Sequence, residues 1–225
     1  MNNIAFISFD KVKDNKFVDE KKRFDLISST GQIKVADGKV GKAARISGGE
    51  YLYSKESPDF SNEDFTIDFW IKFYQIAGFQ CILATCKRHD ADALTIIQNG
   101  SALRLCYNTV EHANSSSWKF YGDFSSNAML NKWQHIALVR QNDSLKVYAD
   151  GHCVGTQNIG SEKICFYENT PMIIGDYTEF SGYAANIAID SLRITKGARW
   201  TGDFTPPTFY SGQLYLSTTG GRCTA

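Results

Sequence analysis

The stretch FTIDFWIKF, residues 65–73, decides the fold class of this chain. Apolar residues occupy every second position, which places on one face Phe65, Ile67, Phe69, Ile71 and Phe73. The other face carries mostly polar residues, including Asp68 and Lys72. A period of two is typical of a β-strand that is buried on one side only. The stretch therefore predicts a strand whose second face, with Asp68, is exposed to solvent.

Two dipeptides each predict a hairpin that joins two adjacent antiparallel strands. Asn99-Gly100 lies within LTIIQNGSALRLCY, and Asp150-Gly151 lies within LKVYADGHCVGT. Both dipeptides accept the positive φ angles of a two-residue hairpin turn. Other short apolar runs, separated by Gly, Asn, Ser or Asp, cover residues 4–9, 42–47, 51–54, 80–86, 132–140, 171–175 and 188–194. With no long helical stripe, this pattern predicts an all-β jelly roll of two antiparallel sheets over residues 1–210, followed by a tail at 211–225.

Composition excludes several classes of protein. The 225 residues are 43% hydrophobic and 13% aromatic, which is enough for a dense core. Lys plus Arg equals Asp plus Glu at 24 each, so we expect no nucleic acid as ligand. No apolar run approaches the roughly 18 residues of a membrane span, and the start MNNIAFISFD does not resemble a signal peptide. We therefore expect no membrane insertion, no export and six reduced cysteines.

Three segments carry a resemblance to a known superfamily. They are DFTIDFWIKF at 64–73, NKWQHIALVRQNDSLKVYADGHCVG at 131–155, and PMIIGDYTEFSGYAANIAIDSLRITKGARWTGDFTPPT at 171–208. In this order they resemble laminin-G-like domains of the concanavalin A-like lectin/glucanase superfamily, which implies a concanavalin A-like β-sandwich. The closing RITKGARWTGDFTPPT is similar to such domains in bacteriophage structural and tail proteins. It implies a virion protein that is assembled in the host cytoplasm.

Within that fold, the closing segment is expected to be architectural. Leu192 and Ile194 should face the core, while Trp200 and Phe204 pack under the departing chain. The Pro206-Pro207 pair cannot donate ladder hydrogen bonds, so we expect it to end the sheet and protect its edge.

Catalysis is not expected, although the superfamily includes glycoside hydrolases. Retaining glycosidases need two carboxylates about 5 Å apart, and the hydrolase patterns E-x-D-x-E and E-x-D-x-x-E are absent. The pair Asp64 and Asp68 is the nearest candidate. His135 lies where resembling domains carry a structural histidine in a core strand. We therefore predict a protein that is not an enzyme.

Exposed loops supply aromatic, amide and charged groups suited to carbohydrate. An aromatic ring can stack on the apolar face of a sugar while polar side chains hold its hydroxyls. The predicted carbohydrate-binding residues are Arg88, Asp92, Tyr107, Asn108, His112, Trp118, Tyr121, Asp176 and Tyr177. The competing interpretation is that these aromatics pack against their own sandwich.

No cofactor is required, but a calcium ion is one candidate. Superfamily members often carry Ca²⁺ near the rim of a sheet, and this resemblance points to Asp10 and Asp190 as ligands. Ca²⁺ takes six to eight oxygens. The alternative is that these aspartates cap turns, a common role of aspartate.

The function expected from these observations is a lectin-like or adhesion protein of a bacteriophage virion. Its partners would be a cell-surface glycan, other virion proteins and, as a homo-oligomer, further copies of itself. The alternative is a purely structural decoration or tail-associated protein that acts through protein–protein contacts.

Overall fold

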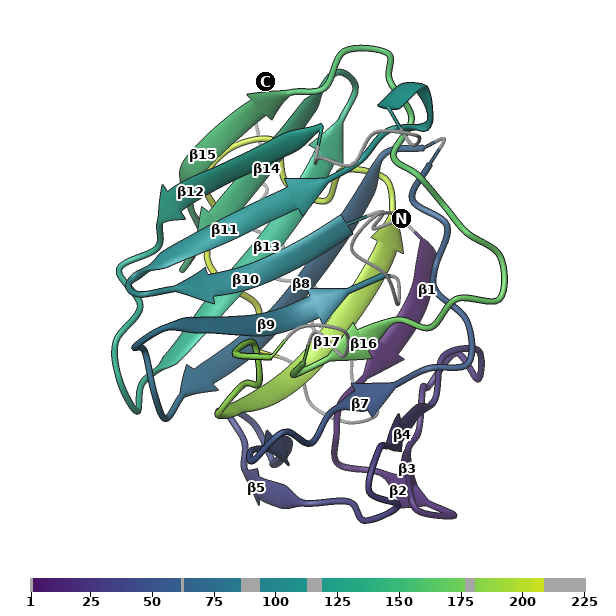
Figure 1. Cartoon of the computed structure of the whole chain (residues 1–225), viewed down its shortest axis with the longest axis vertical. Helices are drawn as coiled ribbons and strands as arrows, with labels where there is room; N and C mark the ends of the chain where they lie inside the picture. The colour runs from purple at the N-terminus through teal and green to yellow at the C-terminus, as the bar shows by residue number, and fades with distance from the viewer. Residues whose placement is uncertain (1, 62, 86–93, 113–118, 177–180, 209–225) are drawn as a thin grey trace, which may run out of the picture.

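The computed structural model describes residues 2–61, 63–85, 94–112, 119–176 and 181–208 of the chain. Two antiparallel sheets pack face to face (Figure 1). The only helical element in these ranges is a single 3-10 turn, η2 (Val110–His112). None of these residues forms a helix long and apolar enough to cross a bilayer. The all-β jelly-roll prediction is therefore confirmed.

The eight-stranded sheet contains both the first and the last strand. Its order is β15 (His152–Asn158), β14 (Ser144–Ala149), β13 (Trp133–Gln141), β8 (Phe65–Phe73), β17 (Ile187–Lys196), β6 (Lys42–Ile46) and β5 (Val35–Asp37). The remaining strand, β1 (Asn2–Ile7), also pairs with β17.

The nine-stranded sheet forms the second layer. Its order is β12 (Phe120–Ser125), β11 (Ala102–Tyr107), β10 (Leu94–Asn99), β9 (Phe79–Ala84), β16 (Ile173–Ile174), β7 (Leu52–Tyr53), β4 (Leu26–Ser28), β3 (Lys16–Phe17) and β2 (Val12–Lys13). Residues 107–128, a span rich in Asn and Ser, contain the edge strand β12.

Both predicted hairpins are confirmed, with one shift in position. Asp150 and Gly151 form the two-residue loop between β14 and β15, with φ angles of 50° and 85°. In the other hairpin Asn99 still pairs with Ala102, so the loop is Gly100 and Ser101. Only Gly100 has a positive φ there, because the first loop position is the one that demands it in this turn.

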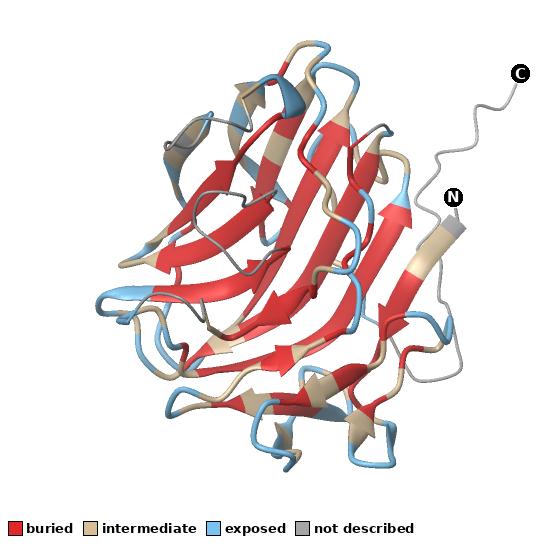
Figure 2. Ribbon diagram, turned by 45° about the vertical axis from the view of Figure 1, so that its right-hand side comes forward, coloured by how far each residue is buried: buried red, intermediate tan, exposed pale blue. Residues whose placement is uncertain are grey.

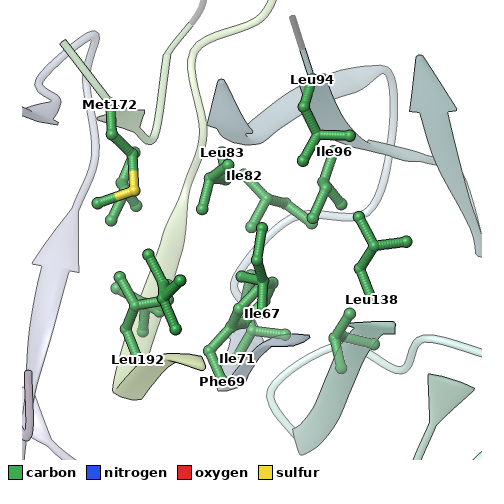
Figure 3. Close-up of a cluster of buried hydrophobic side chains, with 14 of the residues drawn as sticks. Ile67, Phe69, Ile71, Ile82, Leu83, Leu94, Ile96, Leu138, Met172 and Leu192 are labelled. Atoms are coloured by element: carbon green, nitrogen blue, oxygen red, sulfur yellow. The ribbon is translucent and has the colours of Figure 1, made fainter. Parts of the chain in front are cut away.

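The core lies between the sheets, and buried residues run along both (Figure 2). All five apolar residues of FTIDFWIKF belong to it, as the alternation predicts. In Figure 3, side chains of β8 and β17, including Ile67 and Leu192, lie opposite those of β9 and β10, including Ile82 and Ile96. Ile194 joins Leu192 in this core, as expected.

The outer face of the eight-stranded sheet contradicts the expectation of a solvated Asp68. This residue is fully buried. Arg193 donates two hydrogen bonds to its carboxylate, at 2.9 and 2.8 Å, and His135 Nε2 lies 3.4 Å away. Burial alone would raise the pKa of the Asp68 carboxyl, but Arg193 and His135 hold it below its usual value. The structural role predicted for His135 is confirmed.

The segment after β17 covers this buried ion pair. Trp200 and Phe204 stack with ring centroids 3.7 Å apart, and the His135 ring lies edge-on to both. Farther along, Trp70 Nε1 donates a 2.9 Å hydrogen bond to the Pro207 carbonyl. The prolines therefore lie across the face of the sheet rather than at its edge, which corrects the sequence-based expectation.

The segment after β17 is hydrogen-bonded to Gly151 in the β14–β15 hairpin. Phe204 N–H donates to the Gly151 carbonyl at 2.9 Å. A Cβ at Gly151 would collide with the Phe204 carbonyl, and its φ of 85° also excludes most side chains. The hairpin glycine thus serves the turn and the covering segment together.

Replacing Asp68 should destabilise the protein strongly. Asp68→Ala leaves Arg193 buried without its carboxylate, and breaking such a pair typically costs about 3–5 kcal/mol. Urea unfolding followed by tryptophan fluorescence would measure the free energy of unfolding. The control is Asp203→Ala, because Asp203 pairs with His152 on the surface and surface pairs contribute little. Equal stability of the two variants would contradict the importance of the buried pair.

Candidate functional site

Three segments that are distant in the sequence meet beside the middle of β17. β6 pairs with residues 187–189 of β17, and β1 pairs with residues 192–196. Between these two partners β17 carries an irregularity at Asp190. Asp10, which follows β1, and the turn at residues 38–41, which precedes β6, therefore reach Asp190. Bulges of this kind commonly redirect a side chain next to a functional site.

Carboxylate and backbone oxygens converge inside this turn. A Cβ atom built on Gly38 would lie 2.7 Å from Asp190 Oδ2, 2.7 Å from the Val40 carbonyl oxygen and 2.8 Å from the Lys42 carbonyl oxygen. Asp10 Oδ1 accepts a 2.7 Å hydrogen bond from Lys42 N–H. We call this group the oxygen cradle: the Asp10 and Asp190 carboxylates with the carbonyls of Val40 and Lys42. These are the hard oxygen donors that Ca²⁺ prefers.

The backbone is strained beside both carboxylates. Phe9, directly before Asp10, has a φ of 64°, and Ser191, directly after Asp190, has a φ of 54°. Each such conformation costs a non-glycine residue roughly 1–3 kcal/mol and persists only where the surroundings enforce it. Strain of this kind concentrates at functional sites. The two strained residues therefore mark the oxygen cradle as more than an ordinary loop contact.

Electrostatics at the cradle favour a cation. Asp190 is fully buried, and its oxygens accept hydrogen bonds from Val40 N–H at 3.0 Å and from the Ser191 hydroxyl at 2.9 Å. Burial nevertheless raises the pKa of the Asp190 carboxyl from 3.8 to about 6, and the Asp10 carboxylate also raises it. The charged form of Asp190 is thus incompletely compensated by its protein neighbours.

Asp19 shows the contrasting arrangement. Its buried carboxylate accepts hydrogen bonds from four backbone N–H groups, those of Phe6, Lys21, Arg23 and Phe24. Asp19 therefore organises its loop, which is a common role of aspartate. Across the described ranges no three His, Cys, Asp or Glu side chains gather to hold a metal ion, so the cradle depends on its carbonyls.

A groove of about 360 Å³ lies on the outer face of the nine-stranded sheet. Leu52 points into the core, so Tyr51 and Tyr53 on either side of it point outward. Their rings lie 6.1 Å apart and are tilted by 54°. Ile173, which pairs with Tyr53, also lines the groove. The other lining residues are Ser29, Ser54, Lys55, Asn169 and Pro171. We call this space the tyrosine groove.

The tyrosine groove suits a ligand that is both apolar and rich in hydroxyl groups. Two tyrosine rings offer aromatic surface, and Asn169 offers both a donor and an acceptor. Ser29 and Lys55 add further polar groups. No Asp, Glu, His or Cys is among the described residues that line it. Its side chains can therefore bind but include no carboxylate pair for acid–base chemistry.

Two of the predicted carbohydrate-binding residues lie in the interior. Tyr107 ends β11, is 2% exposed and stacks on Phe120, and burial raises its pKa to about 12. Asn108 is 1% exposed, and its Oδ1 accepts a 2.7 Å hydrogen bond from Lys119 N–H. The expectation that both are exposed on a rim loop is wrong, because β11 carries them inside the sandwich.

The other predicted residues are not brought into the tyrosine groove by the described structure. His112 ends η2 and is partly buried. Asp176 follows β16, and burial raises the pKa of its carboxyl. Of Tyr121 only the backbone is described, within β12. Arg88, Asp92, Trp118 and Tyr177 lie outside the described residues.

Sequence reasoning missed the tyrosine groove although a signal was present. In YLYS the alternation places Leu52 on one face and both tyrosines on the other. An aromatic residue on each side of a core leucine marks an aromatic outer face. Ser29 and Asn169 carry no such signal, because only the pairing of β4, β7 and β16 brings their segments together.

Comparison with solved structures shows shared architecture. Domain 4 of AbnA, a GH43 extracellular arabinanase from Geobacillus stearothermophilus, in complex with arabinotriose, superposes with a TM-score of 0.67 and 21% identity over 88% of this chain and 93% of that one. Botulinum neurotoxin type C is described as dependent on two ganglioside molecules for entry into cells. Its structure superposes with a TM-score of 0.63 and 14% identity over 87% of this chain and 48% of that one.

The binding domain of botulinum neurotoxin DC in complex with rat synaptotagmin II gives a TM-score of 0.62 and 14% identity over 87% of this chain and 48% of that one. The chain thus spans about half the length of these neurotoxin structures. At such identities the similarity shows the fold alone.

Sequence comparison identifies the family. No curated protein sequence matches the chain significantly. The sequence profile of the concanavalin A-like lectin/glucanases superfamily, however, matches residues 47–201, which is more than half of the chain. The chain belongs to the concanavalin A-like lectin/glucanase superfamily.

Proposed function

We propose that this protein is a non-catalytic carbohydrate-binding protein whose glycan lies in the tyrosine groove. The observation that carries the proposal is the pair of outward-facing rings, Tyr51 and Tyr53, beside the amide of Asn169 in one groove. A sugar ring presents an apolar face to aromatic rings and hydroxyls to polar side chains, so both parts of the lining are used.

Three similarities support a glycan as the ligand class. The superfamily includes lectins and glucanases, and the arabinanase domain was solved with arabinotriose. Botulinum neurotoxin type C depends on ganglioside molecules. A sugar held on the rings of the tyrosine groove itself meets no carboxylate, whereas glycoside hydrolysis ordinarily needs two of them.

We also propose that the oxygen cradle holds Ca²⁺, with Asp10, Asp190, Val40 and Lys42 as ligands. The fit rests on the convergence of their oxygens and on the raised pKa of Asp190, which a bound cation would lower again. Bound Ca²⁺ would neutralise two carboxylates and hold the ends of β1 and β6 against β17.

The place of this function, we propose, is a bacteriophage virion, where the protein contacts a host glycan and other virion proteins. The similarity of residues 193–208 to phage structural and tail proteins supports this assignment. The alternative is a structural virion protein that acts through protein contacts. The neurotoxin binding domain solved in complex with synaptotagmin II, which shares this fold over about half of its length, supports that alternative.

Removing one tyrosine ring should weaken glycan binding without unfolding the protein. Tyr53→Ala should weaken binding about tenfold or more, which corresponds to about 1.4 kcal/mol, because one stacking surface is lost. The measurement is an array containing arabinotriose, ganglioside oligosaccharides and bacterial surface polysaccharides, followed by calorimetry of the strongest binder. Tyr74→Ala is the matched control, since Tyr74 is half-buried beneath Arg45 on the other sheet. Unchanged binding by Tyr53→Ala would refute the groove assignment.

Asp190→Asn should change both the calcium response and the pH dependence of stability. In chelator, folded Asp190 keeps its proton up to a pKa of about 6, whereas the unfolded residue loses it near 3.8. Wild-type stability therefore falls relative to Asp190→Asn as pH rises from about 4 to 7, by roughly 2–3 kcal/mol. Added Ca²⁺ should raise the thermal midpoint of the wild type at pH 7.5 and leave the variant unchanged.

Two comparisons control this experiment. Asp19→Asn should not alter the calcium response, because Asp19 is satisfied by backbone N–H groups. Mg²⁺ should stabilise less than Ca²⁺, since it requires a smaller octahedral site. A stability difference between wild type and Asp190→Asn that is constant with pH, or a calcium response retained by Asp190→Asn, would contradict the assignment.

The virion assignment predicts that the protein copurifies with particles. Mass spectrometry of density-purified particles from lysed host cells should detect it at a fixed ratio to a capsid protein. Its absence from infectious particles would refute the assignment. Presence on particles together with a blank glycan array would favour the purely structural role.

A further inference from the structure

Two further hollows adjoin the tyrosine groove in series, because neighbouring hollows share lining residues. Asn169 lines the tyrosine groove and also a second hollow of about 280 Å³. Arg23 and Asp59 line that second hollow and a third, also of about 280 Å³. The third hollow reaches Ile4 of β1 and Lys196 at the end of β17. The three hollows therefore form a row that begins on the outer face of the nine-stranded sheet and ends beside β1 and β17.

The second hollow differs chemically from the tyrosine groove. Its lining includes the guanidinium of Arg23 and the carboxylates of Glu56, Asp59 and Glu168. A guanidinium offers several donors in one plane and a carboxylate offers several acceptors, so neighbouring hydroxyls can be bound in pairs. Phe166 adds an aromatic side chain. This hollow thus offers the same two kinds of contact as the first, with more polar groups.

The walls of the second hollow are fixed before any ligand arrives. Asp19 accepts hydrogen bonds from the N–H groups of Arg23 and Phe24, and Arg23 lies over the Phe24 ring at 5.1 Å. In the same lining, Asp59 Oδ1 accepts hydrogen bonds from the N–H and the hydroxyl of Ser61, at 2.8 and 2.6 Å. Walls held in place lower the ordering cost of binding.

From this continuity we infer that the protein binds a linear oligosaccharide across at least two hollows, rather than a single terminal sugar. The inference rests on the proposed function and names its ligand class. The tyrosine groove alone is near the lower end of the range of about 300–1,000 Å³ typical of ligand sites, and the three hollows together approach the upper end. Asn169 stands at the junction, where the chain of sugars passes from the first hollow to the second.

Chain length is the variable that tests this inference. Calorimetry would compare arabino-oligosaccharides of two to six units with gluco-oligosaccharides of the same lengths. In the series that binds, the six-unit member should bind at least tenfold more tightly than the two-unit member. Arg23→Ala should remove most of this gain, because Arg23 lines only the second and third hollows.

Two further variants separate a local effect from a general one. Lys132→Ala removes an exposed cation outside all three hollows and should change neither affinity. Asn169→Gly removes the junction amide while keeping a backbone φ of 59° accessible, and it should weaken every length.

Failure of this inference can be distinguished from failure of the proposed function. Equal affinity for two and six units, or a length gain that survives Arg23→Ala, would overturn the inference and leave the proposed function standing. No binding by any member of either series, together with a blank glycan array, would overturn both.

Discussion

The buried ion pair between Asp68 and Arg193 requires one face of the sandwich to be covered by the chain itself. The two residues belong to β8 and β17, adjacent strands of the eight-stranded sheet, and their charges lie on its outer face. A charge pair removed from water contributes stability only if it is well bonded and stays shielded. The outer face of this sheet therefore has to be covered, and the segment after β17 covers it with Trp200 and Phe204.

This cover makes the two sheets unequal. The eight-stranded sheet has apolar residues on both faces, because Ala137, Val139 and Tyr148 pack under the covering segment. Its outer face is thus covered by the protein's own chain. The outer face of the nine-stranded sheet carries the tyrosine groove instead. A sandwich fold does not specify a function, but this asymmetry leaves the second sheet as the surface on which a ligand can be bound.

The sequence predicts the architecture better than the site, and particular residues show why. The period of two in residues 65–73 and the turn dipeptides are local signals, so the strands and hairpins follow from them. Asp68 could not be placed, because its partner Arg193 is 125 positions away and strand alternation alone assigns an aspartate to solvent. Tyr107 was predicted to be exposed because it lies beside a polar stretch, as a binding residue on a loop would. The structure shows instead that it ends β11 and is buried.

The residues of the proposed binding site follow the same rule. Tyr51 and Tyr53 are two positions apart and could be found from the alternation, whereas Asn169 reaches them only through the pairing of β16 with β7. Asp10 and Asp190 were identified through resemblance. Their convergence with the carbonyls of the turn at residues 38–41 depends on β17 changing partners beside Asp190.

That change of partners has a consequence for the order of folding. The oxygen cradle takes Asp10 from the beginning of the chain, two carbonyls from near residue 40 and Asp190 from the last strand. A ribosome-bound fragment that lacks β17 therefore has no complete cradle, however many of its earlier strands have formed. Contacts of such long sequence separation slow folding, because the entropy of closing the loop is paid before the contact is gained. The cradle becomes available to a cation only once both ends of the domain have met, so occupancy would report completed assembly of the sandwich.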